Sequence, residues 1–139
     1  STYMHEVDSA LGFMDFNAPE RMRSAADFRR AANRIGYTFN WFYVDKRDVA
    51  YFNSGNHPIR ARGTDPSFPV RAGFEWRGWD PDRWLARFEP ARKHPQAHNQ
   101  AYFANWNNKQ ARRFNAADGN FSFGAVHRVE SLERRIRAG

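Results

Sequence analysis

The stretch SAADFRRAANRIGYTFNWFYVDKRDVAYF, residues 24–52, decides the fold that we expect for this chain. Ser24 stands three residues before Asp27, which is the spacing of a capping-box-like helix start. Apolar side chains then follow at helical spacing: Ala25, Phe28, Ala31, Ala32 and Ile35. Gly36 comes next, at the position where a left-handed helix cap is wanted. The pattern predicts an amphipathic helix over residues 24–35, ended by Gly36.

The rest of the stretch changes to the chemistry of β-strands. Residues 37–44 (YTFNWFYV) are aromatic and β-branched, with few helix formers among them. The polar residues 45–48 (DKRD) have the character of a turn, and residues 49–52 (VAYF) resemble a returning strand. The simplest interpretation is a β-hairpin.

Away from this centre the patterns are weaker. Residues 1–19 form a poorly defined lead-in that ends in a loop. Further segments are predicted as follows: a long irregular excursion over 53–73, a short helix or turn at 79–82, a Pro-containing connection over 90–99, a strand over 100–106 and a helix from 131 onward. These elements alone would leave strand edges and aromatic faces uncovered. We therefore expect an α+β chain, residues 1–139, that is one fragment of a larger protein.

Composition narrows the class of protein. Aromatic residues make up 17% of the chain, which is too many for a disordered segment. There is no cysteine, so disulfides and thiolate metal sites are excluded. No apolar run has the length that a bilayer requires, so we expect no membrane partner. The net charge of +7 raises nucleic acid as a partner, but arginines scattered among acidic residues favour a solvated surface.

Several polar residues invite a chemical interpretation. His94 and His98 have a spacing found in zinc sites, but Pro95 disfavours a helix there, and a solvated loop pair is favoured. Ser1 could be an N-terminal nucleophile, although a chance chain start is favoured. Asp118 could cap a turn or bind calcium, and the turn is favoured. The run Asn105-Trp106-Asn107-Asn108 could be structural or could stabilise an oxyanion, and periodicity does not choose.

Taken together, several segments resemble the penicillin acylase (penicillin amidase) family, in particular its aculeacin-type and lactone-acylase branches. The segments that carry the resemblance are RRAA (29–32) through NWFYVD (40–45), AYFNSG (50–55), GTDP (63–66), FEWRGW (74–79), NWNNK (105–109) and HRV (127–129). They occur in the order found in the family. They match an internal part of the large subunit, beginning near residue 20.

The resemblance implies a fold and an activity. The family has the N-terminal-nucleophile hydrolase fold, an αββα sandwich of antiparallel sheets between helices. Its catalytic Ser attacks the amide between a hydrophobic acyl group and an amine. Ser1-Thr2-Tyr3 does not match the surroundings of that serine, so we expect the nucleophile to lie outside this chain. The expected partners are the rest of the acylase and an acyl-amide substrate, in the periplasm or outside a bacterial cell.

The resemblance also implies roles for individual residues. Asn107 matches the asparagine of the oxyanion hole, and Arg128 matches an arginine that positions it. Phe39 matches a residue of the acyl-side pocket. Asp118 and the backbone carbonyl of Pro66 match ligands of a structural calcium ion.

One departure from the family concerns Arg112-Arg113-Phe114, which stand where relatives often have Pro-Gly. This puts the local turn, and with it the substrate preference, in question. By itself the chain is expected to be inactive, because it lacks the nucleophile. Two alternatives remain open: a basic, aromatic-rich module that binds single-stranded nucleic acid, and an inactive fragment that self-associates.

Overall fold

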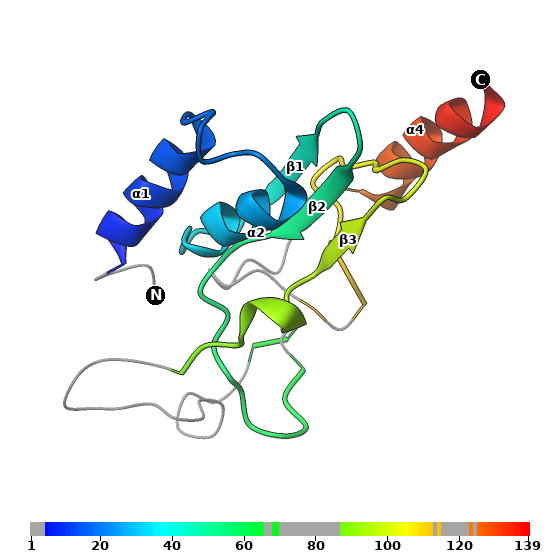
Figure 1. Cartoon of the computed structure of the whole chain (residues 1–139). Helices are drawn as coiled ribbons and strands as arrows, with labels where there is room; N and C mark the ends of the chain where they lie inside the picture. The colour runs from blue at the N-terminus through cyan, green and yellow to red at the C-terminus, as the bar shows by residue number, and fades with distance from the viewer. Residues whose placement is uncertain (1–4, 66–67, 70–86, 113, 115–122, 124) are drawn as a thin grey trace.

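The computed structural model describes residues 5–65, 68–69, 87–112, 114, 123 and 125–139. Its elements in chain order are α1 (Glu6–Phe16), α2 (Ala25–Asn33), β1 (Asn40–Val44), β2 (Val49–Asn53), the 3-10 helix η1 (Ala91–Lys93), β3 (Gln96–His98) and α4 (Val126–Ala138) (Figure 1). The three strands form one antiparallel sheet in the order β1-β2-β3. The predicted α+β class is confirmed.

The predicted amphipathic helix is present as α2. The Ser24 hydroxyl accepts a hydrogen bond from the Asp27 backbone N–H, with 3.2 Å between the two atoms, and so caps the helix as the sequence predicted. Gly36 does not have the predicted left-handed conformation, because Gly55 and Gly63 are the glycines with positive φ among the described residues. A close approach explains the glycine instead: an added Cβ at Gly36 would lie 2.9 Å from the Asn56 side-chain nitrogen.

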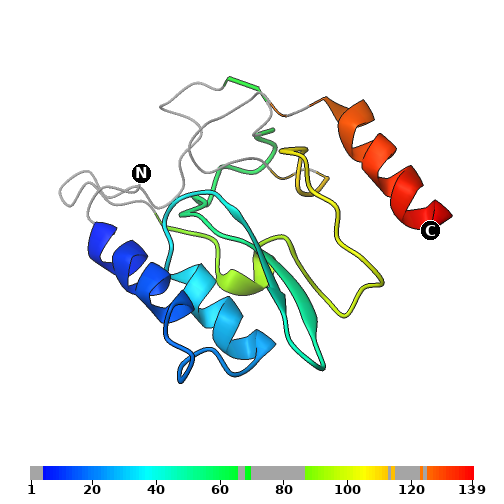
Figure 2. The same ribbon diagram turned by 90° about the horizontal axis from the view of Figure 1, so that it is seen from above.

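Helix α1 lies beside α2, as Figure 2 shows, and the periodicity of residues 1–19 does not predict it. The helix has no wide apolar stripe, because small residues make its contact with α2. Ser9 and Gly12 are its buried residues, and a Cβ at Gly12 would lie 2.8 Å from the Ala31 carbonyl oxygen. These two small residues therefore allow α1 and α2 to pack closely, whereas larger side chains at the same positions would increase the distance between the helices.

The hairpin of β1 and β2 is confirmed with its turn at residues 45–48. One carboxylate oxygen of Asp45 accepts from the backbone N–H groups of Arg47 and Asp48, each at 2.7 Å. The pairing runs from Asn40 opposite Asn53 to Val44 opposite Val49. Because strand side chains alternate, one face of the hairpin is directed to the helices and the other away from them.

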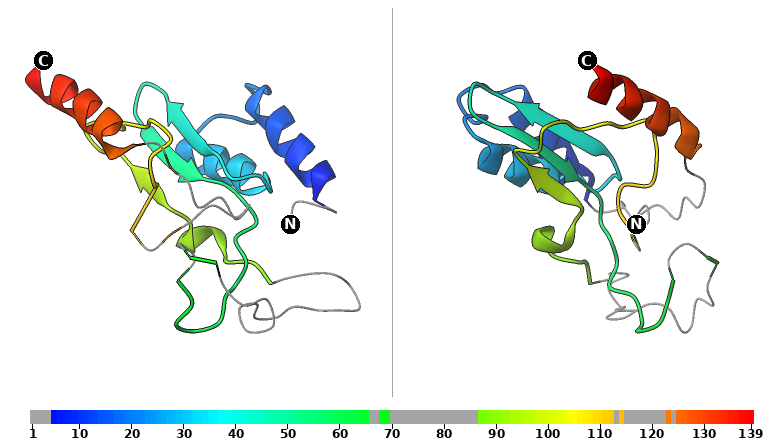
Figure 3. Two further views of the ribbon diagram at one scale, coloured as in Figure 1. Left: turned by 180° about the vertical axis from the view of Figure 1, so that it is seen from behind. Right: turned by 90° about the vertical axis from the view of Figure 1, so that its right-hand side faces the viewer.

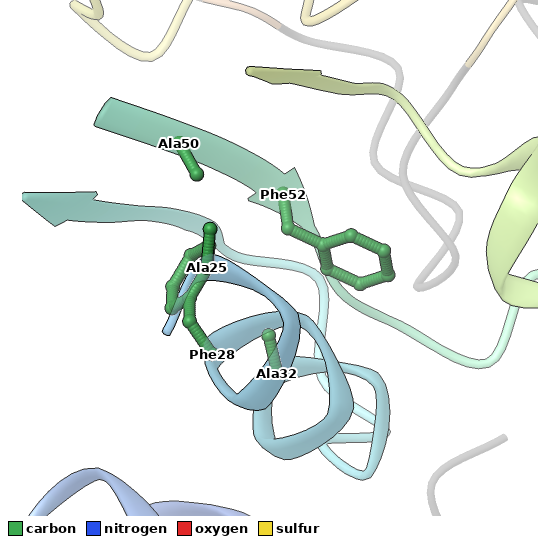
Figure 4. Packing of buried hydrophobic residues seen from close by; sticks show 5 residues of the cluster. All are labelled: Ala25, Phe28, Ala32, Ala50 and Phe52. Carbon is green, nitrogen blue, oxygen red and sulfur yellow. The ribbon is translucent and has the colours of Figure 1, made fainter. Parts of the chain in front are cut away.

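The core lies between α2 and one face of the sheet. It is formed by Ala25, Phe28, Ala32, Ala50 and Phe52, which Figure 4 shows in close-up. Partly buried side chains extend the core on this face: Phe16, Met22, Trp41, Tyr43 and Ala91. Small alanines on α2 allow the helix to approach the strands, and the two Phe rings fill the remaining space.

The third strand is not where the sequence predicted it. Residues 100–106 form no strand, and β3 occupies residues 96–98, inside the segment predicted as a connection. The pairing of this strand begins beside Pro95, whose carbonyl oxygen accepts from the Asn53 N–H at 2.9 Å. It ends at Asn99, whose φ of 52° turns the chain away. The prediction failed because aromatic content at 100–106 reflects packing onto the sheet rather than pairing within it.

Helix α4 confirms the predicted helix near the C-terminus, and it begins at Val126 rather than at residue 131. It lies on the other side of the sheet from α1 (Figures 1 and 3). One link to the body is the Arg137 side chain, which donates to the Tyr102 hydroxyl at 2.8 Å. Within the described part of the chain, no helix has the length and apolar character needed to cross a membrane. The predicted turn at 79–82 lies outside the described residues.

Candidate functional site

Asn107 lies in a tight turn between Trp106 and Asn108. The Trp106 backbone N–H donates to the Asn108 side-chain oxygen at 3.0 Å, which closes the turn. Asn107 at its centre has a φ of 53°, in the left-handed region that asparagine tolerates better than most residues. Its side chain is exposed. The turn therefore presents an amide group to the surroundings on a defined backbone.

Arg128 lies next to this turn although 20 residues separate it from Asn108 in the chain. It is in the first turn of α4, where its N–H donates to the Ala125 carbonyl at 3.1 Å. Its guanidinium carbon lies 6.0 Å from the centre of the Trp106 ring, which is within cation–π range. The structure thus brings Arg128 to the residue that precedes Asn107.

Phe39 is directed to a different part of the molecule. Its ring is 48% exposed and lies 5.6 Å from the Trp41 ring, which in turn contacts Phe13 and Phe16 of α1. Because side chains alternate along the strand, the neighbouring Asn40 faces the opposite way. The structure does not bring Phe39 together with Asn107 and Arg128.

An open cleft lies beside the turn, on the face of the sheet that α2 does not cover. Its volume is about 530 Å³, and both amide and aromatic side chains line it. Its amide and aromatic lining residues include Asn40, Phe42, Tyr51, Phe103, Asn105 and Asn108. Neutral amides and aromatic rings together suit a ligand with an apolar part and a few hydrogen-bonding groups. Sequence reasoning missed Asn40 and Tyr51, whose only signal was their place on the alternate face of the predicted hairpin.

Tyr51 stays a hydrogen-bond donor in this cleft. Burial raises the pKa of its hydroxyl above the ordinary value, so the phenol keeps its proton. It donates to the Asn40 side-chain oxygen at 2.7 Å.

The histidines differ from the prediction of a solvated pair. His94 is 6% exposed, with its ring nitrogens 2.9 Å from the Asn53 carbonyl and 3.3 Å from the Glu89 carbonyl. Its location was predicted wrongly, because the loop that carries it folds over the end of β2. His98 is more exposed and pairs with Asp48 at 2.9 Å. Among the described residues, no group of three or more His, Cys, Asp or Glu side chains could hold a metal ion.

A second buried histidine packs against the first. The rings of His57 and His94 meet edge to face, with 4.7 Å between their centres. The pKa of His57 is lowered to about 3, chiefly by burial and less by the neighbouring His94 and Arg60, while a hydrogen bond to the Ser54 carbonyl opposes the shift. This ring is therefore neutral in the folded chain at neutral pH.

Three residues singled out in the sequence lie outside the described part of the structure. They are Ser1, Pro66 and Asp118. The calcium ligands expected from the resemblance therefore stay a prediction.

The fold and site define an α+β unit that carries an amide-bearing turn, with an arginine beside it, at the edge of an aromatic cleft. Comparison with known proteins identifies the family. The penicillin amidase family profile matches residues 1–139, and the chain belongs to this family. Over 116 residues it is 30% identical to penicillin G acylase from Escherichia coli. That alignment covers 79% of this chain and 13% of the length of the E. coli protein.

Proposed function

We propose that this chain is part of the large subunit of an acylase that hydrolyses the amide bond between a hydrophobic acyl group and an amine. Membership of the penicillin amidase family supports the hydrolase class, and similarity to a penicillin G acylase supports an acyl-amide substrate. The proposed nucleophile is an N-terminal serine supplied by the parent protein from outside these residues. The chain alone is then inactive.

The observation that carries the proposal is the turn at Asn107, with Arg128 beside it. An exposed amide on a left-handed turn can donate to an oxygen that gains negative charge as a carbonyl is attacked. The Arg128 guanidinium, over the Trp106 ring, adds positive potential beside the same turn. In this mechanism the serine oxygen bonds to the acyl carbon, the amine leaves with a proton, and water releases the acid from the acyl-enzyme.

Further parts of the proposal rest on the resemblance. They are the aculeacin-type or lactone-acylase branch, the acyl-side role of Phe39, and a periplasmic or secreted location. The half-exposed ring of Phe39 is available for an acyl group brought by the rest of the parent. Asp118 and the Pro66 carbonyl are the proposed calcium ligands, with hard oxygen donors that suit this ion.

The Asn107→Gly variant of the full parent protein tests the oxyanion role. Glycine keeps the left-handed backbone and removes only the amide, so the turn is preserved. We expect kcat to fall by about 100-fold to 1,000-fold, with KM nearly unchanged, because the donor acts on the transition state. Both constants are measured from initial rates of penicillin G hydrolysis, which is monitored through the amine that is released.

The matched control is Asn99→Gly. Asn99 has nearly the same φ, 52°, but its side chain donates to the Asp48 carboxylate and accepts from the Val49 backbone N–H, away from the proposed site. Its replacement should lower stability and leave kcat within about twofold. An Asn107→Gly enzyme with wild-type kcat would refute the site assignment.

A further inference from the structure

Asn40 is the hub of a polar network at the first residue of β1. Its side-chain oxygen accepts from the Tyr51 hydroxyl at 2.7 Å and from the Asn53 side-chain nitrogen at 3.0 Å. Its side-chain nitrogen donates to the Asn105 oxygen at 3.2 Å. The last bond joins residues 65 positions apart in the chain and links the sheet to the segment that carries Asn107.

The orientation of the Asn40 amide is determined by its neighbours. The Asn53 nitrogen also donates to the Phe39 carbonyl at 3.2 Å, so a nitrogen, not an oxygen, faces Asn40 from that side. Tyr51 keeps its proton and donates as well. The Asn40 side-chain oxygen therefore accepts from both donors, and the side-chain N–H group is directed at Asn105.

Asn105 stands two residues before Asn107, at the start of the turn. A ring contact supports the same segment: the Phe103 centre lies 6.1 Å from that of Phe42 and 6.0 Å from that of Tyr51. The hydrogen bond and the ring contact together hold the entry to the turn on the outer face of the hairpin. The rigid hairpin can in this way set where the Asn107 amide lies.

We propose that Asn40 is a positioning residue for the reaction, acting through Asn105 to hold the Asn107 amide where the oxyanion forms. The inference rests on the proposed function, since it needs Asn107 to act in catalysis. Asn40 itself touches no reacting atom. A shift of the donor by a fraction of its hydrogen-bond length weakens stabilisation of the transition state more than binding of the substrate.

The first test replaces Asn105 by Leu in the full parent protein, with penicillin G as the substrate. Leucine has a similar shape and no acceptor, so the bond from Asn40 is lost. We expect kcat to fall between about tenfold and a hundredfold, a larger change than any rise in KM. Asn105→Asp is the conservative control: a carboxylate still accepts from the Asn40 nitrogen, and kcat should stay within about threefold of wild type.

The second test uses Asn40→Asp, which keeps an acceptor for Tyr51 and Asn53. The Asn105 amide can turn over and donate to the new carboxylate, so this single variant should retain most activity. The Asn40→Asp/Asn105→Asp double variant places two acceptors face to face and should lose kcat as Asn105→Leu does. This comparison also decides the question if the leucine variant fails to fold.

The third test combines Asn105→Leu with Asn107→Gly. If Asn105 acts by positioning the Asn107 amide, its replacement has no further effect on kcat once that amide is gone. An equal loss of kcat in both backgrounds would overturn the inference and leave the role of Asn107 intact. A fully active Asn107→Gly enzyme would instead overturn the proposed function, and this inference with it.

Discussion

The helix-and-hairpin region and the segment over residues 100–112 are built in opposite ways. In the first, the Phe52 side chain is 1% exposed and β2 pairs with a strand on each side. In the second, the Trp106 side chain is 52% exposed, and described contacts to the sheet come from side chains such as Phe103 and Asn105. The first region is a well-packed base, and the proposed site lies on an irregular segment that is attached to this base through side-chain contacts.

This division separates stability from function. Substitutions in the base should change the free energy of unfolding, whereas substitutions in the segment should change turnover with little effect on folding. Three further predictions test this separation, beginning with the largest effect on stability.

Phe52→Ala should lower the free energy of unfolding by about 3–5 kcal/mol, because it empties space between α2 and the sheet. The change is measured by urea unfolding of the chain, which is monitored through tryptophan fluorescence. Phe42→Ala is the matched control: Phe42 is on the same hairpin, but on the outer face and half exposed. A control variant that loses as much stability as Phe52→Ala would show that the outer face belongs to the base.

His57 should make the stability of the folded chain depend on pH in the acidic range. Its pKa is about 3 in the folded chain against an ordinary value of 6.5, so below pH 6.5 the unfolded chain binds a proton that the folded chain does not. Its contribution to stability is therefore present above pH 6.5 and is lost as the pH falls toward 3. The slope is about 1.4 kcal/mol per pH unit for one proton.

The His57→Phe variant isolates this effect, because phenylalanine keeps a ring against His94 and Phe114 and does not titrate. The difference in unfolding free energy between wild type and variant should change with pH between 6.5 and 4.5. A difference independent of pH would show that another group binds the proton.

Trp106→Leu should have the smallest effect on stability, at most about 1 kcal/mol, because an exposed cation–π contact contributes no more. It should nevertheless lower kcat of the parent severalfold, since Arg128 loses its support beside Asn107. Trp106→Phe keeps a ring under the guanidinium and should recover most of the activity. A large loss of stability in the leucine variant would remove the distinction between the two regions.

Local patterns predicted the base well. The helix over residues 24–35 follows from periodicity, the hairpin follows from strand-forming composition on either side of a polar turn, and the Ser24 cap is where the sequence placed it. Helix α1 could not be predicted in this way, because Ser9 and Gly12 make its contact through closeness rather than apolar area. Burial of His94 depends on a loop that returns over β2, which is a tertiary effect.

The site was predicted less completely. Asn107 and Arg128 came from the resemblance, and periodicity could not distinguish Asn107 from its neighbours. The left-handed turn and the contact of Arg128 with Trp106 exist only in the folded chain. The bond between Asn40 and Asn105 spans 65 positions, and nothing local at either residue indicates it.

The close approach at Gly36 has a consequence for how related sequences can differ. An added Cβ would lie 2.9 Å from the nitrogen and 3.4 Å from the carbon of the Asn56 side-chain amide. A relative with alanine at this position therefore needs the side chain at position 56 to rotate away or to be shorter. Positions 36 and 56 should therefore covary among related sequences: where position 36 is not glycine, position 56 should differ from asparagine.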